Sequence, residues 1–376
     1  MRGAFHAQSP INRPNSLFHK ILRISSYNSK IWRHFFAKPM ILKIDLNFFR
    51  APRNAPMARY DLSNAERWML ELTVPANSLR LIAIDIDGTL LGPEFKISDT
   101  DLATLRRAHA DGVEVILVTG RRHTFALPIA QQLGFDLWLI SSNGAITRSL
   151  GGETFHRDLL PEPTCRELVQ VMQEFRGQTV LTFDRNDLLG DVAGTIVIER
   201  LEYLEGSIQR WLEKNMQYIK FVVPIENALT TDPVQAMFCG PVADMQRVLQ
   251  VLATCGLPIT VLRTEYPGRD LSIVDVLNAG CSKGHALERW ANHRQITREQ
   301  VMAIGDNYND IEMLALAGHP FIMGNASEEL RGRGWKLTRS NAESGVSAAV
   351  EYVLNGKAIE AEEPDEALRS AIGVSL

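Results

Sequence analysis

Apolar runs alternate with amphipathic stretches in the segment that follows residue 78. Three mostly apolar runs each stop at a short polar segment: 81–84, 113–118 and 137–140. A predicted helix separates each run from the next. The first helix begins at Ser98, with Asp101 in capping-box spacing, and the second helix covers about 123–133. A glycine follows each helix. Strands and helices that alternate with short links predict a doubly wound parallel α/β sheet.

The pattern changes at about residue 147. Several strand-like runs follow one another without a helix between them, and helical stretches are expected near 162–176 and 241–254. This arrangement predicts an α+β insertion with its own antiparallel sheet over 147–272. The parallel pattern resumes with a helix from Ser282 and a strand at 301–304. The core is therefore expected at 79–146 and 273–356, after a basic leader with a polar lead-in and before an acidic tail at 357–376.

Composition limits the class of protein. A length of 376 residues accommodates about two domains, and 45% hydrophobic with 22% charged residues is ordinary for a globular chain. No stretch approaches the ~18 apolar residues of a membrane span, so no integral membrane protein is expected. The four cysteines lie far apart, with no zinc-ligand spacing, which favours a reduced, cytoplasmic setting.

Charge is distributed unevenly. Residues 1–56 carry ten Lys and Arg against the single acid Asp45, whereas residues 57–376 carry a net charge of −13. The acidic body makes DNA or RNA an unsuitable substrate. The leader has the composition of an organellar transit peptide, which would place the protein in an organelle. Alternatively, it is an upstream extension with Met57 as the start, a disordered segment, or an arm that binds nucleic acid or membrane.

Two carboxylates follow the first apolar run directly. Asp85 and Asp87 lie one residue apart where a buried strand ends, which is where ligands bind in parallel α/β sheets. Taken alone, the pair is equally consistent with an acidic turn. Two close carboxylates at a buried site require a compensating cation, and Mg²⁺ suits oxygen ligands. Further polar residues occupy equivalent places at strand ends or helix starts, and these ends share one edge of a parallel sheet: Thr119, Lys283, Asp306 and Asp310.

These residue types match phosphoryl transfer through a covalent intermediate. A carboxylate at a rigid strand end, such as Asp85, can attack phosphorus in line with the leaving oxygen. Asp87 is placed to protonate the leaving alkoxide and then to activate water as a base. Gly88 allows a phosphate to approach the backbone closely.

The remaining polar residues supply charge and metal ligands. Lys283 offers positive charge to the equatorial phosphoryl oxygens, and Thr119 offers a neutral hydrogen bond. Asp306 completes the oxygen ligands of a hard cation, with Asp310 and Asn309 beside it. Each residue alone has a simpler explanation, as a helix cap or a solvated side chain. Their joint occurrence at strand ends favours the chemical interpretation.

The sequence resembles the haloacid dehalogenase superfamily and, within it, the Cof-type sugar-phosphatase branch. The resemblance covers about 79–355 and rests on five motifs: Asp85-Ile86-Asp87-Gly88-Thr89-Leu90, Val118-Thr119-Gly120-Arg121, Ser142-Asn143-Gly144-Ala145, Ser282-Lys283-Gly284 and Gly305-Asp306-Asn307-Tyr308-Asn309-Asp310. It implies a Rossmann-like core with a mobile cap between the motif of Thr119 and the motif of Lys283, which is where the predicted insertion lies. It also implies a nucleophile at Asp85, an acid/base at Asp87, and Mg²⁺ bound by Asp85, the backbone carbonyl of Asp87 and Asp306.

The expected activity is Mg²⁺-dependent hydrolysis of small phosphomonoesters, chiefly sugar phosphates. Alternatives are a phosphosugar mutase on the same scaffold and a non-catalytic phosphosugar-binding protein. The oligomeric state is left open. Arg269 and Tyr266, in the loop before the chain returns to the core, either contact the substrate or are solvated. Substrate contacts are expected at Gly88, Gly120, Arg121, Asn143, Gly144, Asn309 and Arg269, and metal contacts at Asp85, Asp87, Asp306 and Asp310.

Overall fold

The computed structural model describes residues 79–187, 190–191, 194–204, 208, 212–213, 215–266 and 270–359. The leader, the polar lead-in and the end of the acidic tail therefore lie outside the described residues, as does Arg269. No helix in the described part of the chain combines the length and the hydropathy needed to cross a membrane. All four cysteines are free thiols.

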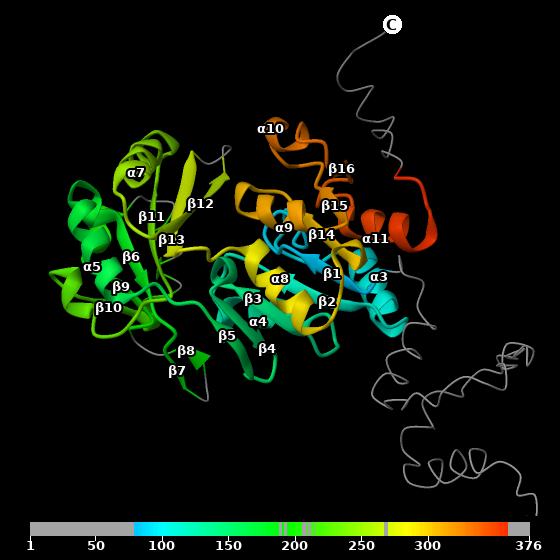
Figure 1. Cartoon of the computed structure of the whole chain (residues 1–376), viewed down its shortest axis with the longest axis horizontal. Helices are drawn as coiled ribbons and strands as arrows, with labels where there is room; N and C mark the ends of the chain where they lie inside the picture. The colour runs from blue at the N-terminus through cyan, green and yellow to red at the C-terminus, as the bar shows by residue number, and fades with distance from the viewer. Residues whose placement is uncertain are drawn as a thin grey trace, which may run out of the picture. The chain divides into compact units, whose positions relative to one another are not determined.

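The larger sheet has eight strands, and six of them run parallel (Figure 1). The strand order is β16 (Lys336–Leu337), β15 (His319–Ile322), β14 (Val301–Gly305), β1 (Leu81–Ile84), β2 (Glu114–Val118), β3 (Trp138–Ser141), β4 (Ile146–Ser149) and β5 (Thr154–Arg157). The last two strands form an antiparallel hairpin on the sheet edge. The predicted doubly wound α/β core is confirmed.

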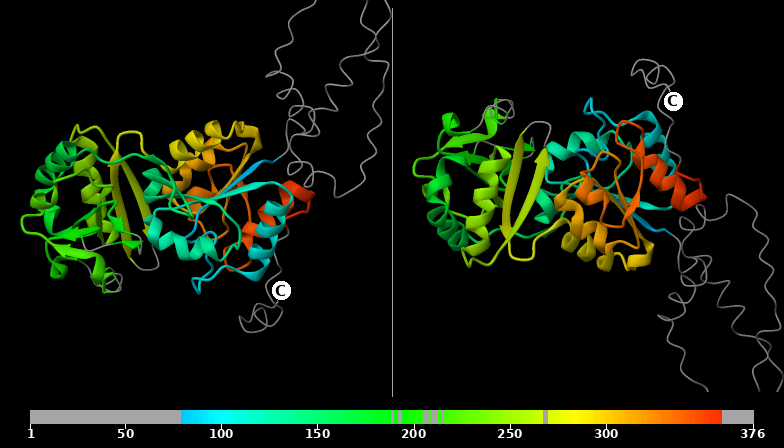
Figure 2. Two further views of the ribbon diagram at one scale, coloured as in Figure 1. Left: turned by 90° about the horizontal axis from the view of Figure 1, so that it is seen from below. Right: turned by 90° about the horizontal axis from the view of Figure 1, so that it is seen from above.

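Helices cover both faces of this sheet (Figure 2). Alternate residues of β1 serve the two faces, because successive strand side chains point in opposite directions. Ile82 and Ile84 belong to one hydrophobic cluster and Leu81 and Ala83 to the other. The first cluster includes residues of α3 (Asp99–Ala110), α4 (His123–Gln131) and α11 (Gly345–Asn355). The second includes residues of α8 (Lys283–His293), α9 (Ile311–Leu316) and α10 (Glu328–Arg331).

Ser98 begins α3 as the sequence predicts. Its hydroxyl accepts a hydrogen bond from the Asp101 backbone N–H at 3.0 Å and donates one to the Asp101 carboxylate at 2.8 Å. Asp101 also accepts a hydrogen bond from the Ser347 backbone N–H of α11 at 2.7 Å. This buried carboxylate therefore ties α3 to α11.

The smaller sheet has six strands, in the order β10 (Ile219–Phe221), β9 (Ile196–Ile198), β6 (Thr179–Thr182), β11 (Gln235–Gly240), β13 (Leu271–Asn278) and β12 (Ile259–Tyr266). Residues of α5 (Glu162–Val171) and α7 (Val242–Thr254) pack against one of its faces. The remaining regular segments are the two-stranded β7 (Asn186–Asp187) with β8 (Gly190–Asp191), and the 3₁₀ turns η3 (Gln173–Gln178), η4 (Leu201–Tyr203), η5 (Met216–Tyr218), η6 (Ile225–Ala228) and η8 (Arg298–Gln300).

Two details of the insertion differ from the sequence-based expectation. The smaller sheet is not wholly antiparallel, because β9 and β10 pair in parallel after the intervening crossover. The boundaries between the segments that form the two sheets also differ from the predicted positions, 147 and 272. The β4–β5 hairpin, 146–157, belongs to the larger sheet, and β13 continues in the smaller sheet to Asn278. The hairpin is polar and was not recognised as strand from the sequence.

Candidate functional site

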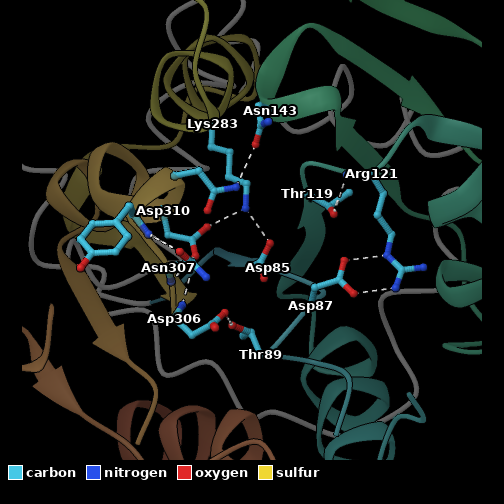
Figure 3. Close-up of polar contacts among 12 residues, drawn as sticks. Asp85, Asp87, Thr89, Thr119, Arg121, Asn143, Lys283, Asp306, Asn307 and Asp310 are labelled. Carbon is cyan, nitrogen blue, oxygen red and sulfur yellow. Dashed lines mark hydrogen bonds and ion pairs between the residues drawn. The ribbon is translucent and has the colours of Figure 1, made fainter. Parts of the chain in front are cut away.

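Four neighbouring strands of the larger sheet deliver the predicted polar residues to one edge. Asp85 follows β1, Thr119 follows β2 and Asp306 follows β14, while β3 leads into the 3₁₀ turn η2 (Ser142–Gly144). Lys283 begins α8, whose N-cap is the Ser282 hydroxyl. Figure 3 shows these side chains converging on Asp85. The structure thus brings together groups that lie more than two hundred residues apart in the chain.

Lys283 forms the centre of the buried charge cluster. Its Nζ donates to Asp85 Oδ1 at 2.6 Å and to Asp310 Oδ1 at 2.7 Å. The Asp310 carboxylate also accepts hydrogen bonds from the Asp306 and Asn307 backbone N–H groups through Oδ2, at 3.1 and 3.0 Å. Asp310 is therefore fully engaged in orienting Lys283 and the 3₁₀ turn η9 (Tyr308–Asp310).

Burial dominates the electrostatics of this cluster. It raises the pKa of Asp85 to about 7; the carboxylates of Asp310 and Asp87 act in the same direction, and the Lys283 ammonium opposes them. Burial likewise raises the pKa of Asp306 well above its usual value. Burial alone would lower the pKa of Lys283, but the Asp310 and Asp85 carboxylates together raise it. The ammonium therefore stays charged at this buried position.

The cluster has the composition of a divalent-cation site. Carboxylate oxygens of Asp85, Asp306 and Asp310 lie within 4.8 Å of one another. Three carboxylates against the single Lys283 ammonium leave two negative charges uncompensated, which a hard divalent cation with oxygen ligands would balance. Asp306 is held in place by the Thr89 hydroxyl, which donates to its Oδ1 at 2.8 Å. The residues present thus fit Mg²⁺.

Asp87 points away from the cluster toward Arg121 (Figure 3). The guanidinium donates to both carboxylate oxygens, at 2.6 and 2.5 Å, and each side chain is 28% exposed. The backbone N–H of Arg121 in turn donates to Thr119 Oγ1 at 3.1 Å, which leaves the Thr119 hydroxyl proton available to another acceptor. Arg121 thus fixes the orientation of the Asp87 carboxyl group.

Glycines are required where the loops meet. Gly88 adopts φ +85°, and a Cβ there would clash with the Asp306 carboxylate. Gly144 adopts φ +108°, and a Cβ there would clash with the Ser282 backbone oxygen, just before Lys283. A Cβ at Gly120 would come within 3.1 Å of Asn143 Oδ1. Gly88 and Gly144 allow the loops that carry Asp85, Asp306 and Lys283 to pack together, because a Cβ at either position would clash and the backbone has positive φ.

Two predicted substrate contacts are occupied by protein partners. Asn143 Oδ1 accepts from Asn309 Nδ2 at 2.9 Å, and Asn143 Nδ2 donates to the Asp275 carboxylate at 2.8 Å. Asp275 was not recognised from the sequence. It lies within the apolar strand β13, and the only available signal was a single acid at a strand position whose neighbours are aliphatic.

The smaller sheet reaches the site through its edge strand β12. The Asn307 side-chain amide accepts from the Glu265 backbone N–H at 3.3 Å and donates to the Glu265 backbone oxygen at 3.1 Å. The Arg263 guanidinium lies over the Tyr308 ring, 3.9 Å from its centroid. Burial raises the pKa of Tyr266, and the carboxylates of Asp87, Asp85 and Asp306 add to this effect. The negative charge of the site therefore acts on the Tyr266 hydroxyl.

Residues 82–350 match the family model of the haloacid dehalogenase-like hydrolases. The chain belongs to this family. It is 27% identical over 296 residues to phosphatase YwpJ of Bacillus subtilis, a match that covers 73% of this chain and all of that protein. It is 29% identical over 253 residues to the HMP-PP phosphatase of Escherichia coli, which covers 67% of this chain and 86% of the relative.

Solved structures agree with the family assignment. A haloacid dehalogenase-like hydrolase from Bacteroides thetaiotaomicron is 26% identical, with a TM-score of 0.60, over 74% of this chain and 100% of that one. A subclass IIB sugar phosphatase, 21% identical with a TM-score of 0.57 over 73% of this chain and 98% of that one, shares the fold. This hydrolase is therefore an enzyme whose named relatives are phosphatases.

Proposed function

We propose that this hydrolase is a Mg²⁺-dependent phosphatase that cleaves small phosphomonoesters, chiefly sugar phosphates, through an aspartyl-phosphate on Asp85. The observation that carries the proposal is the buried cluster in which Lys283 bonds both Asp85 and Asp310 beside Asp306. This arrangement presents one carboxylate at a strand end, next to fixed positive charge and a cation site, as in-line phosphoryl transfer requires. The names of the relatives support the reaction class.

We assign the metal to Asp85, Asp306 and the backbone carbonyl of Asp87. Bound Mg²⁺ would neutralise charge on the phosphoryl group and on the nucleophile. Asp310 holds Lys283 and the η9 turn in place, so we assign it an orienting role.

The covalent sequence uses the chain's own groups. Asp85 Oδ attacks phosphorus as the ester P–O bond breaks, and the leaving oxygen takes a proton from Asp87. Water then attacks the aspartyl-phosphate while giving a proton to Asp87; the bond between phosphorus and the Asp85 oxygen breaks, which releases phosphate and restores the Asp85 carboxylate. The two hydrogen bonds from Arg121 orient the Asp87 carboxyl group. Proton donation to the leaving group requires the protonated carboxyl to turn away from Arg121, which frees the guanidinium for an anionic oxygen of the substrate. Thr119 can donate its hydroxyl proton to a phosphoryl oxygen.

We further propose that the smaller sheet with α5 and α7 is a cap that selects the leaving group. Its support is the pair of contacts at Glu265 and Asp275, which join strands of that sheet to the loops of the site. Within β12 we assign substrate contact to Tyr266, because the carboxylates of Asp87, Asp85 and Asp306 act on its hydroxyl electrostatically.

A screen of phosphorylated metabolites tests the function. With Mg²⁺, inorganic phosphate should be released steadily from at least one sugar phosphate, and an excess of chelator should lower the rate by at least about 100-fold, because the uncompensated carboxylates then repel the substrate. Wild-type protein with Ca²⁺ in place of Mg²⁺ serves as the control for cation charge. An isomerised sugar phosphate that forms only with a bisphosphate activator would instead establish a mutase, and no turnover of any compound would contradict both activities.

Replacing Asp87 with Asn separates the acid role from binding. The amide cannot exchange protons, so the rate on a sugar phosphate should fall by about 10²- to 10⁴-fold. The leaving oxygen of an aryl phosphate needs little protonation, so formation of the aspartyl-phosphate from this substrate should be less affected. Burst kinetics on the aryl phosphate would resolve the two steps. Equal slowing of the first step with both substrates would contradict the acid assignment.

A further inference from the structure

Asn143 joins three loops of the site. It is fully buried after β3, with a left-handed backbone of φ 54° and ψ 29°. Its backbone N–H donates to the Thr119 oxygen at 3.0 Å, and its Oδ1 accepts from Asn309 Nδ2 at 2.9 Å. The next residue, Gly144, packs directly on the Ser282 carbonyl before Lys283. A change in the orientation of Asn143 would therefore shift all three loops.

Asp275 fixes the orientation of the Asn143 amide. One carboxylate oxygen of Asp275 accepts from Asn143 Nδ2 and the other from Gln235 Nε2, both at 2.8 Å. The Asn143 Nδ2 atom therefore has an acceptor, Asp275, and the Asn143 Oδ1 atom has a donor, Asn309. A flipped amide would lose both hydrogen bonds, so only one orientation is stable.

The cost of this arrangement indicates a specific role. Asp275 is only 5% exposed, and burial raises its pKa to about 7, although the hydrogen bond from Asn143 and the Lys283 charge both lower it. An aliphatic residue at such a strand position would avoid the desolvation of a carboxylate. Asp275 belongs to the smaller sheet, whereas Asn143 and Asn309 follow strands of the larger one. The carboxylate thus connects the two sheets through buried polar groups.

We propose that Asp275 is a positioning residue for the phosphatase reaction: it holds Asn143 so that the Thr119–Arg121 loop and the Asn309–Asp310 segment are aligned around Asp85. The inference rests on the proposed function and deepens it, since it makes the placement of the cap strand β13 a condition for an aligned site. Asn143 and Asn309 then act by holding these loops, and their side chains are not substrate ligands.

Two substitutions test the positioning role. Asp275→Val places a β-branched residue that suits a strand but removes both acceptors, and should lower kcat by about 10- to 100-fold with KM changed less than threefold. Asp275→Asn should restore kcat to within about fivefold of wild type. The side-chain carbonyl of Asn at position 275 can still accept from Asn143. Its NH₂ group can donate to Gln235 Oε1 once the Gln235 amide has turned by 180°, because that oxygen has no hydrogen-bond partner within the described part of the chain.

Hydrogen–deuterium exchange provides a readout other than activity. Peptides that contain 119–123 and 306–310 should exchange faster in Asp275→Val than in wild type, and at the wild-type rate in Asp275→Asn. Asp101→Val is the matched control, because it removes a buried carboxylate that ties α3 to α11. It should lower thermal stability while leaving kcat and the exchange of these two peptides unchanged.

Each outcome is decisive. Asp275→Val with kcat within threefold of wild type and unchanged exchange would overturn the positioning role, as would an Asp275→Asn variant as impaired as Asp275→Val. Should Asp275→Val fail to fold, Asp275→Ser takes its place with the same expected results, because its short side chain cannot reach both partners. Wild-type protein that turns over no phosphomonoester would refute the proposed function, whereas the exchange comparison would still decide whether Asp275 aligns the loops.

Discussion

Replacement of Asp85 by Asn should abolish phosphate release, with a fall in turnover of at least about 10⁴-fold. The amide keeps the shape of the carboxyl group but has no oxygen nucleophile able to form the covalent intermediate. The substitution also removes one of three neighbouring carboxylates, so the protein should unfold at or above the wild-type temperature when metal is chelated. Phosphate release and thermal unfolding, measured on the same preparation, separate loss of chemistry from loss of fold.

The outcome that would contradict the nucleophile assignment is residual turnover within about tenfold of wild type. Quenching wild-type enzyme during turnover of a ³²P-labelled substrate should trap label on protein, and the Asp85→Asn variant should trap none. Label that persists in the variant would move the nucleophile to another residue.

Lys283→Met should have the second largest effect, because it acts on both stability and activity. Lys283 is 1% exposed and neutralises Asp85 and Asp310. Methionine fills a similar volume but leaves both carboxylates without a counter-charge, so the free energy of unfolding should fall by about 3–5 kcal/mol in chelator. Mg²⁺ should recover part of this loss by mass action on the folded state, whereas phosphate release should stay below about 1% of wild type.

Lys96→Met is the matched control for this prediction. Lys96 also pairs with a carboxylate, Glu94 at 3.5 Å, but both side chains are exposed. An exposed pair contributes about 0–1 kcal/mol, so the control should unfold at nearly the same denaturant concentration as wild type and retain activity. Equal destabilisation by the two substitutions would show that the Lys283 pairs contribute no more than a surface pair.

The core could be predicted from the sequence because buried parallel strands produce uninterrupted apolar runs. β1, β2 and β14 lie within one residue of their expected limits. The β4–β5 hairpin could not be predicted in this way, since it contains Arg148 and His156. Arg148 is nevertheless buried, because it pairs with Asp184, a residue 36 positions along the chain. Such a long-range partner leaves no local pattern.

The same distinction applies to the site. Asp85, Thr119 and Asp306 stand at strand ends, so the topology alone predicts that they meet. Asp275 stands inside a strand, and its partners Asn143 and Gln235 are 132 and 40 residues away. No periodicity or motif links these three residues. The hydrogen-bond partners of the Asn143 and Asn309 side-chain amides could likewise not be predicted, because the motifs indicate where these residues lie and not which group each side chain binds.

The contact between Asn307 and Glu265 has an expected consequence for aggregation of the protein. β12 is the outer strand of its sheet, and an outer strand presents unpaired backbone N–H and C=O groups on which another chain can add a strand. The Asn307 amide occupies one such N–H and C=O pair at the end of this strand. The loop that carries Asp306, our proposed metal ligand, should therefore also protect the sheet edge from intermolecular β-pairing. Substitutions at Asn307 should be judged by aggregation as well as by turnover.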